Sequence, residues 1–254
     1  TIQFTKGELV EKDFCPFNTV DGPVLFVQTG KYPYIYIKIR DMKIGTGRSW
    51  EGGIQSADCF GNTLYFLADT IYKATVQHPG FIKVEAVRDL EEGEQREFGM
   101  IFSRMVEGRR IVYRVCDDPA DGIVVDVEDE ELEKMQLITT HKSKLICLMK
   151  RDITESARAI SPNIITLKYD VFDVYSAVDS SLVFFLTTDG QLSALNTDTM
   201  EVVSCPMSAD GALLKHIVSV RAGKITVTGS SGGSYYLYTA DVPEEFRSIE
   251  KKDE

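Results

Sequence analysis

Short apolar runs separated by turn residues dominate the hydrophobic pattern of this chain. The clearest stretch is Phe172–Met207, in which four strand-like pieces are separated by three turn signals. The pieces are Val174–Val178, Leu182–Leu186, Gln191–Leu195 and Val202–Cys205, with turns at 179–181, 189–190 and 196–198. Turns this short force neighbouring strands to pair. The stretch therefore predicts one small four-stranded antiparallel sheet.

The second piece of this unit recurs along the chain as an apolar run flanked by Gly, Asp and Ser. The runs are Val24–Val27, Leu64–Leu67, Ile111–Tyr113, Leu145–Leu148, Val183–Leu186 and Ile225–Val227. They stand about forty residues apart on average. A period of roughly 40–50 residues with four strands per repeat is typical of β-propeller blades, so the pattern predicts six blades.

The unbroken apolar character of these runs favours a propeller over a β-sandwich. Strands of a sandwich alternate because one face meets solvent, whereas stacked blades bury their inner strands on both faces. Four of the six runs are apolar throughout, and Ile225–Val227 is the clearest exception because it contains Thr226. The strand after a run alternates better: Ile35, Ile37 and Ile39 interleave with Tyr34, Tyr36 and Lys38. We expect burial to fall from the axis outward.

In these runs and their spacing the chain resembles the β-propeller superfamily, which includes WD-repeat and kelch proteins. The resemblance covers nearly the whole sequence. No blade carries a Trp-Asp ending or a Gly-His start, and no kelch-type double glycine recurs from blade to blade. The resemblance therefore implies an architecture and no subfamily, and it assigns no binding residues.

The two ends of the repeat region complement each other. Ile2–Val10 has a strand-turn-strand pattern broken at Lys6-Gly7, while the last unit, His216–Asp241, shows only three strands. We therefore predict an all-β, six-bladed β-propeller with four-stranded antiparallel blades over residues 1–241, its ring closed by the N-terminal strand. Pro243 and the early acidic residues of 242–254 indicate a short C-terminal helix or a disordered tail.

Three segments between the runs have a different character. Asp152–Pro162 is interpreted as a short helix or an irregular insertion because of its alanines. The acidic runs Asp89–Glu97 and Asp126–Glu133 are interpreted as solvated connectors. A calcium site or a site for a basic partner is the alternative, but the glycine that an EF-hand loop requires is missing from the second run.

Composition limits the classes of partner and the compartment. The chain has 254 residues and a formal charge of −11, which argues against a phosphate-binding surface. The basic patches Arg109-Arg110 and His141–Arg151 are interpreted as solvated strand ends.

No apolar run approaches the eighteen residues of a membrane span. The five cysteines are odd in number and far apart and no glycosylation pattern occurs, so we expect a reducing compartment, cytoplasmic or nuclear. Cys147 and Cys205 are expected to be buried in apolar strands.

The motifs that could carry chemistry lack the structural context or the spacing that each requires. Gly229–Gly233 matches the G-x-S-x-G nucleophile elbow, but a strand follows where a helix is required, which predicts a hairpin loop. The three histidines, His78, His141 and His216, lack metal-ligand spacing and are interpreted as solvated or hydrogen-bonded surface residues. We therefore predict no catalytic residue, no metal and no cofactor.

The function predicted on this basis is a non-enzymatic protein-interaction platform inside the cell. Its partner-binding residues are Arg48 and Trp50, on the glycine-rich loop Gly45–Gly53, together with Tyr32 and Tyr34. Loops on rigid scaffolds carry function, and Trp, Tyr and Arg most often anchor interfaces. The alternatives are a six-bladed metal-dependent hydrolase or lactonase, and a regulatory propeller domain of a larger multidomain protein. Nucleic acid is not an expected partner, and the oligomeric state is left open.

Overall fold

The structure is a computed structural model of the 254-residue chain. It describes residues 1–10, 14–19, 22–27, 35–39, 42–46, 55–60, 63–78, 81–97, 99–127, 130, 134–149, 157–168, 170–177 and 180–250. For residues 8–54 it describes the backbone of the strands and no side chains.

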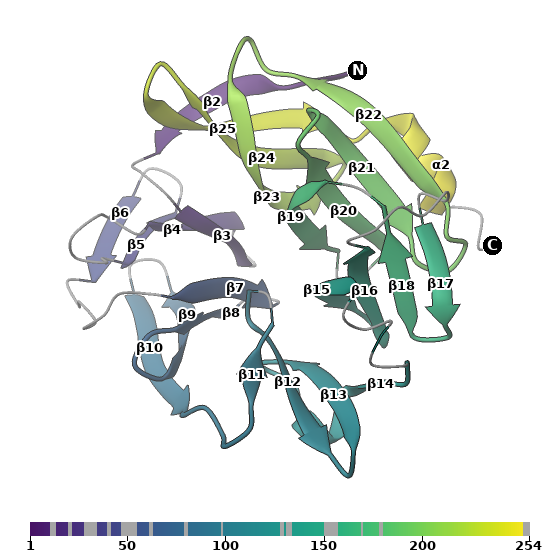
Figure 1. The fold of residues 1–254 in the computed structure, drawn as a ribbon. Coiled ribbons are helices and arrows are strands. Elements are labelled where there is room, and N and C mark those ends of the chain that lie inside the picture. Colours follow the sequence, from purple (N-terminus) through teal and green to yellow (C-terminus); the bar gives the residue numbers. More distant parts are fainter. Residues whose placement is uncertain are drawn as a thin grey trace.

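The described strands form six sheets placed around a common centre (Figure 1). Sheet 1 contains β3 (Phe14–Thr19), β4 (Gly22–Val27), β5 (Ile35–Ile39) and β6 (Met42–Thr46); sheet 2 contains β7 (Ser56–Phe60), β8 (Thr63–Leu67), β9 (Ile71–His78) and β10 (Phe81–Arg88); sheet 3 contains β11 (Gln95–Arg96), β12 (Ile101–Val106), β13 (Arg109–Arg114) and β14 (Ile123–Val125). Sheet 4 contains β15 (Met135–His141), β16 (Lys144–Met149), β17 (Ala157–Ser161) and β18 (Ile164–Leu167); sheet 5 contains β19 (Val171–Ser176), β20 (Leu182–Thr187), β21 (Gln191–Asn196), β22 (Val202–Ser208) and β1 (Ile2–Gln3); sheet 6 contains β23 (Leu213–Arg221), β24 (Lys224–Ser231), β25 (Ser234–Asp241) and β2 (Thr5–Val10). The described helices are the single-turn η1 (Pro119–Asp121) and α2 (Glu244–Glu250).

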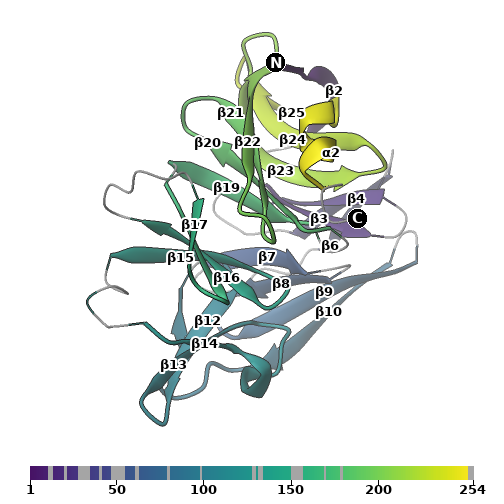
Figure 2. The same ribbon diagram turned by 90° about the vertical axis from the view of Figure 1, so that its right-hand side faces the viewer.

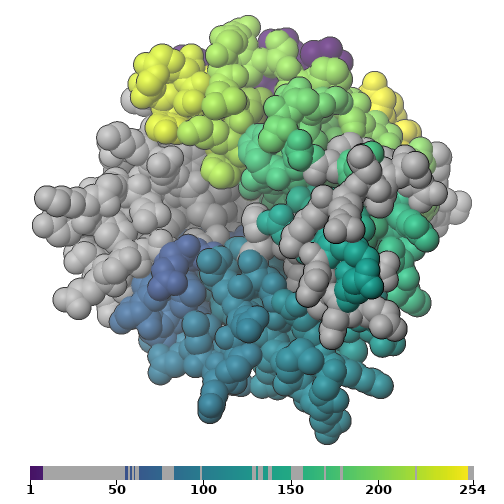
Figure 3. Space-filling view, viewed as in Figure 1, coloured from purple at the N-terminus to yellow at the C-terminus, as the bar shows by residue number. Residues whose placement is uncertain are grey.

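One strand from each sheet contacts strands of its neighbours, and these contacts run round the centre. Strand β3 contacts β7 and β23, β23 contacts β19, β19 contacts β15, and β15 contacts β12. Between sheets 2 and 3 the hydroxyl of Ser56 donates to the carbonyl of Gly99 at 2.6 Å. Figure 2 shows the sheets from the side, and in Figure 3 the coloured atoms of sheets 2 to 6 follow one another around the molecule. A ring of small sheets around an axis is the β-propeller architecture, which confirms the predicted class.

Apolar layers between neighbouring sheets hold the ring together. All six side chains of β20 are buried. Leu182, Phe184 and Leu186 belong to the cluster shared with sheet 6, whereas Phe185 belongs to the cluster shared with sheet 4. A strand that packs against both neighbours must be apolar at every position, which is the physical reason for the unbroken runs. The two-faced burial predicted for this run is confirmed.

The four strands predicted within Phe172–Met207 are present as β19, β20, β21 and β22, paired antiparallel in that order. The prediction missed a fifth strand. β1 pairs with β22 in parallel, with Ile2 opposite Met207. The expectation of four antiparallel strands is therefore wrong for sheet 5, because the chain start adds its own strand to the outer edge.

The predicted pairing of the N-terminal segment with the last sheet is observed for β2, which lies antiparallel to β25. The predicted turn at Lys6-Gly7 is wrong: the break between the two N-terminal strands falls at Phe4. Gly7 lies inside β2 at a register shift, and a Cβ there would lie 3.1 Å from the carbonyl oxygen of Leu237. The glycine permits a close approach of two strands, and its presence alone does not indicate a turn.

Sheet 4 departs most from the predicted pattern. Its strand order is β15-β16-β18-β17, and β16 and β18 are parallel. The interpretation of Asp152–Pro162 as a short helix or an irregular insertion is wrong for Ala157–Ser161, which form β17, while 150–156 lie outside the described residues. The hydroxyl of Thr166 donates to the carbonyl of Arg158 and Ala157 lies opposite Leu167, so pairing with β18 overrides the helix preference of alanine.

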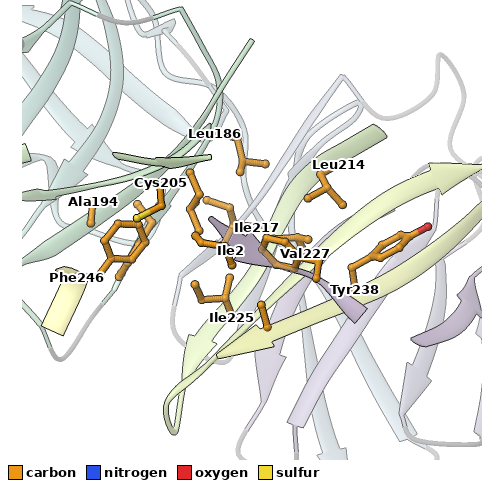
Figure 4. Close-up of a cluster of buried hydrophobic side chains, with 14 of the residues drawn as sticks. Ile2, Leu186, Ala194, Cys205, Leu214, Ile217, Ile225, Val227, Tyr238 and Phe246 are labelled. Carbon is orange, nitrogen blue, oxygen red and sulfur yellow. The ribbon is translucent and has the colours of Figure 1, made fainter. Parts of the chain in front are cut away.

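The C-terminal helix α2 packs onto the sheets. Phe246 and Ile249 are buried in the cluster between sheets 5 and 6, which also contains Ile2 and Phe4 (Figure 4). The side-chain amide of Asn196 donates to the carbonyl of Ile249 at 2.7 Å. Of the two predicted alternatives, helix or disordered tail, residues 244–250 form the helix.

Candidate functional site

The predicted partner-binding residues Tyr32, Tyr34, Arg48 and Trp50 lie outside the described residues. Gly45 and Thr46, at the start of the glycine-rich loop, end strand β6. The structure therefore does not test this surface, and its assignment remains a prediction.

A different candidate surface lies on β19 and β23, the inner strands of sheets 5 and 6. Each strand contains a register shift near its start, between Val171 and Asp173 in β19 and between Leu214 and His216 in β23. An extra residue in a strand re-aims side chains, and such bulges are enriched beside functional sites. We name Phe172, Asp173, Leu213, Lys215 and His216 the bulge surface.

Large apolar side chains lie at the surface in two places, at the register shift of β19 and at the first residue of β23. Phe172 is 38% exposed, although Val171 and Val174 on either side pack against the layer shared with sheet 4. Leu213 is 64% exposed beside the buried Leu214. Two exposed apolar residues on contacting strands form the kind of feature that a partner protein covers.

Polar contacts fix the geometry of this surface. One carboxylate oxygen of Asp173 accepts from the backbone N–H of Ile217 at 2.6 Å, and the other lies 3.4 Å from Nδ1 of His216. The carboxylate thus joins β19 to β23. The ammonium group of Lys215 lies 4.8 Å from the ring centre of Tyr235 and donates to its hydroxyl at 3.4 Å. The surface therefore combines apolar, aromatic and cationic groups held on rigid strands.

A second polar cluster joins sheets 4 and 5. His141, at the end of β15, is 1% exposed, and its Nδ1 lies 2.7 Å from the hydroxyl oxygen of Ser176 on β19. Its Nε2 is buried and has no hydrogen-bond partner among the described residues. The interpretation of His141 as a surface residue is wrong, because the strand that covers it is distant in sequence.

Charges surround this buried ring. Burial lowers the pKa of His141 below its ordinary value, and the nearby Lys142 lowers it further, so the imidazole is neutral at neutral pH. Lys144 donates to a carboxylate oxygen of Asp198 at 2.7 Å and to the carbonyl of Thr197, and Lys142 donates to Ser181. Lys142 is exposed, as predicted, and Lys144 is partly buried, and both lysines link the two sheets. The imidazole is inaccessible to a substrate, so the cluster acts as a contact between sheets.

The acidic run Asp89–Glu97 is also more structural than predicted. It contains β11, and the side chain of Glu94 is fully buried. Glu94 accepts two hydrogen bonds from Arg88, at 2.7 and 2.6 Å, and one from the hydroxyl of Tyr113 at 2.8 Å. Burial opposes ionisation, but these bonds lower the pKa of Glu94 overall. The interpretation as a solvated connector is wrong at this residue. Of the second run, only 126, 127 and 130 are described.

The glycine motif of the last sheet and two of the cysteines follow their predictions. Gly232 and Gly233 adopt positive φ angles of 58° and 78° in the turn between β24 and β25, which confirms a hairpin in place of a nucleophile elbow. Cys147 and Cys205 are buried, as predicted, and burial raises the pKa of Cys147 to about 12. Among the described residues, no group of three or more His, Cys, Asp or Glu side chains could hold a metal ion. Over the same residues, no helix has the length and apolar character to cross a membrane.

Arg110, from the predicted basic patch of β13, forms an ion pair with Glu97. Lys150 and Arg151, at the end of the other patch, lie outside the described residues. The patch cations with a described ion pair therefore bind side chains of the protein itself.

Comparisons with known proteins identify no family for this chain. No protein-family model and no curated protein matches the chain. Among solved structures, 96% of the chain aligns with the whole of the β-propeller domain of Cps50 (Swd1) from Myceliophteria thermophila, at 10% identity and a TM-score of 0.41. This likeness is too weak to carry an argument about this chain. The assignment to the β-propellers rests on the ring of sheets.

Proposed function

We propose that this protein is a non-enzymatic interaction platform whose bulge surface anchors a partner protein. The observation that carries this proposal is the pair of register shifts in β19 and β23, beside the exposed Phe172 and Leu213. A surface on rigid strands needs little ordering when a partner binds, so more of the binding free energy is retained.

The scaffold in this proposal is a six-bladed ring in which each sheet is one blade and the N-terminal strand closes the circle. The six sheets and the pairing of β2 with β25 support it. Pairing with β2 covers the outer edge of β25, and a propeller leaves only short, protected sheet edges. We place the protein in the cytoplasm or nucleus, as its cysteine pattern suggests, and a fluorescent fusion found outside both compartments would contradict this assignment.

The test of the bulge surface is a double substitution with a matched control. Phe172→Ser with Leu213→Ser removes both exposed apolar side chains, whereas Val87→Ser with Leu90→Ser removes two of comparable exposure elsewhere (40% and 44%). Proteins crosslinked to each purified variant in extract of the source cells are quantified by mass spectrometry. We expect at least about a tenfold loss of a defined partner with the first pair alone, since 1.4 kcal/mol is a factor of ten. Equal capture by both double variants would overturn the assignment.

The loop surface predicted from sequence is tested in the same assay. Under that prediction, Trp50→Ala weakens capture at least about tenfold with folding nearly intact. Capture that falls with Trp50→Ala and not with the bulge variants would move the interface to Arg48, Trp50, Tyr32 and Tyr34. A variant that loses several degrees of melting temperature with unchanged capture would show that Trp50 belongs to the core.

A further inference from the structure

The N-terminal segment lies across the outer edges of two neighbouring sheets. β1 pairs in parallel with β22 of sheet 5, and the N–H of Phe4 donates to the carbonyl of Ser208 at 2.7 Å. β2 then pairs antiparallel with β25 of sheet 6, where Thr5 lies opposite Thr239 and Val10 opposite Tyr235. Figure 1 shows β2 beside β25 at the rim of the molecule, and Figure 3 shows the purple N-terminal atoms next to those of sheet 6. We name the surface formed by residues 207–208 and 235–239 the edge groove.

The edge groove recognises its occupant by side chains as well as by backbone. Ile2 and Phe4 are 4% and 1% exposed and belong to the apolar cluster between sheets 5 and 6. The exposed Lys6 places its ammonium group 3.7 Å from the ring centre of Tyr236. At position 7 only glycine fits without crowding the carbonyl of Leu237. The groove thus selects an extended peptide with apolar residues at its second and fourth positions, a cation at the sixth and glycine at the seventh.

These contacts join the segment to residues about two hundred positions later in the sequence. None of the contacts depends on the two partners belonging to one chain, because backbone pairing and apolar burial are the same in cis and in trans. The pairing of β2 with β25 is also interrupted by a register shift between Lys6 and Leu9. An edge strand with interrupted pairing is one that an equivalent strand can replace.

We propose that the edge groove accepts the N-terminal segment of a second copy of this chain, so that two molecules exchange segments and form a dimer. Exchange of an identical element preserves every contact of the segment, which makes it a low-cost route to association. The charge of −11 on each copy opposes association, so the dimer forms more readily as salt rises. This inference does not rest on the proposed function, because it concerns the opposite, outer edge of the sheets.

The first experiment measures binding of a fluorescent peptide with the sequence of residues 1–10, TIQFTKGELV, to the full-length chain. In the full-length chain, Lys6→Glu weakens the binding of the chain's own N-terminal segment to the edge groove through an exposed side chain. Phe4→Leu weakens the same binding through a buried side chain. We expect each variant to bind the peptide at least about fivefold more tightly than the unmodified chain, because its groove is more often vacant.

Substitutions in the peptide test the side-chain contacts. Peptides carrying Phe4→Ala or Lys6→Glu should bind at least about tenfold more weakly than the native peptide, and a peptide carrying Lys6→Arg should bind like the native one. Lys6→Glu keeps the test valid if Phe4→Leu prevents folding.

The second experiment tests the source of the exchanged segment. Sedimentation velocity of the unmodified full-length chain over a range of protein and salt concentrations should show a dimer that increases with both and dissociates when excess peptide is added. Absence of peptide binding to folded Lys6→Glu chain would overturn the edge groove as an exchangeable site. Peptide binding with a chain that stays monomeric at its highest soluble concentration would overturn exchange between copies. A dimer that does not dissociate when the peptide is added would also overturn exchange between copies, because it would use another surface.

Discussion

Sheet 5 meets its two neighbours in different ways. Against sheet 6 it packs an apolar cluster that also takes in Ile2, Phe4 and the helix residue Phe246 (Figure 4). Against sheet 4 it has a smaller apolar cluster, and the end of this interface is polar, with His141 against Ser176 and Lys144 against Asp198. The packed cluster of the first interface is stabilised by removing apolar area from water, which does not depend on pH, although Asp173 and His216 also meet between these two sheets. The second is stabilised in part by groups whose charge can change, so the two interfaces should respond differently to the same perturbation.

The largest effect is expected at the apolar interface. Phe246→Ala removes a fully buried ring that lies 5.9 Å from the ring of Phe184, and should lower the free energy of unfolding by about 3–5 kcal/mol. Urea denaturation followed by circular dichroism measures this change. The control is Glu245→Ala on the exposed face of the same helix, which should change it by less than about 0.5 kcal/mol. Equal midpoints for the two variants would show that α2 contributes no packing.

The polar interface should weaken in mild acid. The folded state lowers the pKa of His141 below the unfolded value of about 6.5, so the neutral form is favoured by folding. The stabilisation is fully present above that unfolded pKa and is lost as the pH falls through it toward the lower folded pKa. One proton limits the slope to about 1.4 kcal/mol per pH unit. The described charged groups around the ring are Lys142 and Lys144, which oppose its protonation, and Asp198, which favours it.

Urea denaturation at a series of pH values between 7.5 and 5 would measure this slope, the range being chosen to bracket about 6.5. His141→Asn, which keeps a polar group near Ser176 without a titrating ring, should flatten the profile below about pH 6.5. His216→Asn is the matched control because His216 is partly exposed at a different interface, and this variant should keep the slope. Identical profiles for the unmodified chain and His141→Asn would mean that the buried ring does not couple folding to pH.

The smallest effect is expected for the ion pair between Lys144 and Asp198. Both side chains are partly exposed, at 22% and 42%, so solvent screens the interaction. A double-mutant cycle with alanine at both positions should give a coupling of at most about 1 kcal/mol, which decreases with added salt. The more exposed pair Lys224 with Asp241, within sheet 6, should show no measurable coupling. A coupling that salt does not change would indicate that the hydrogen bond between the two side chains contributes more than their charges.

The same contrast separates what the sequence could predict from what it could not. Strands buried on both faces must be apolar at each position, so β16 and β20 were evident from their runs. The parallel pairing of β1 with β22 depends on contacts across the whole chain and leaves no local pattern. Pairing with β18 likewise decides the conformation of β17, against the helix preference of its alanines.

The candidate surface was harder to predict than the fold. A bulge is a mismatch between two strands, so the register shift at Phe172 is invisible until its partner β20 is known. Polarity alone suggested that His141 is exposed, because Ser176, which covers it, stands thirty-five positions later. Phe172-Asp173 at the start of a strand was the available signal, since an acidic residue there interrupts the pattern of a buried strand.

The meeting of two segments far apart in the sequence in one apolar cluster has a consequence for synthesis. Ile2 and Phe4 share that cluster with Phe246 and Ile249, so the earlier segment must wait until the later one has been made. At roughly 5–20 residues per second, the delay for a chain of this length is on the order of ten seconds or more. During that time Ile2, Phe4 and the unpaired edge of β2 remain accessible to other chains on the same message. The ribosome-bound protein should therefore depend on chaperones more than the finished protein does.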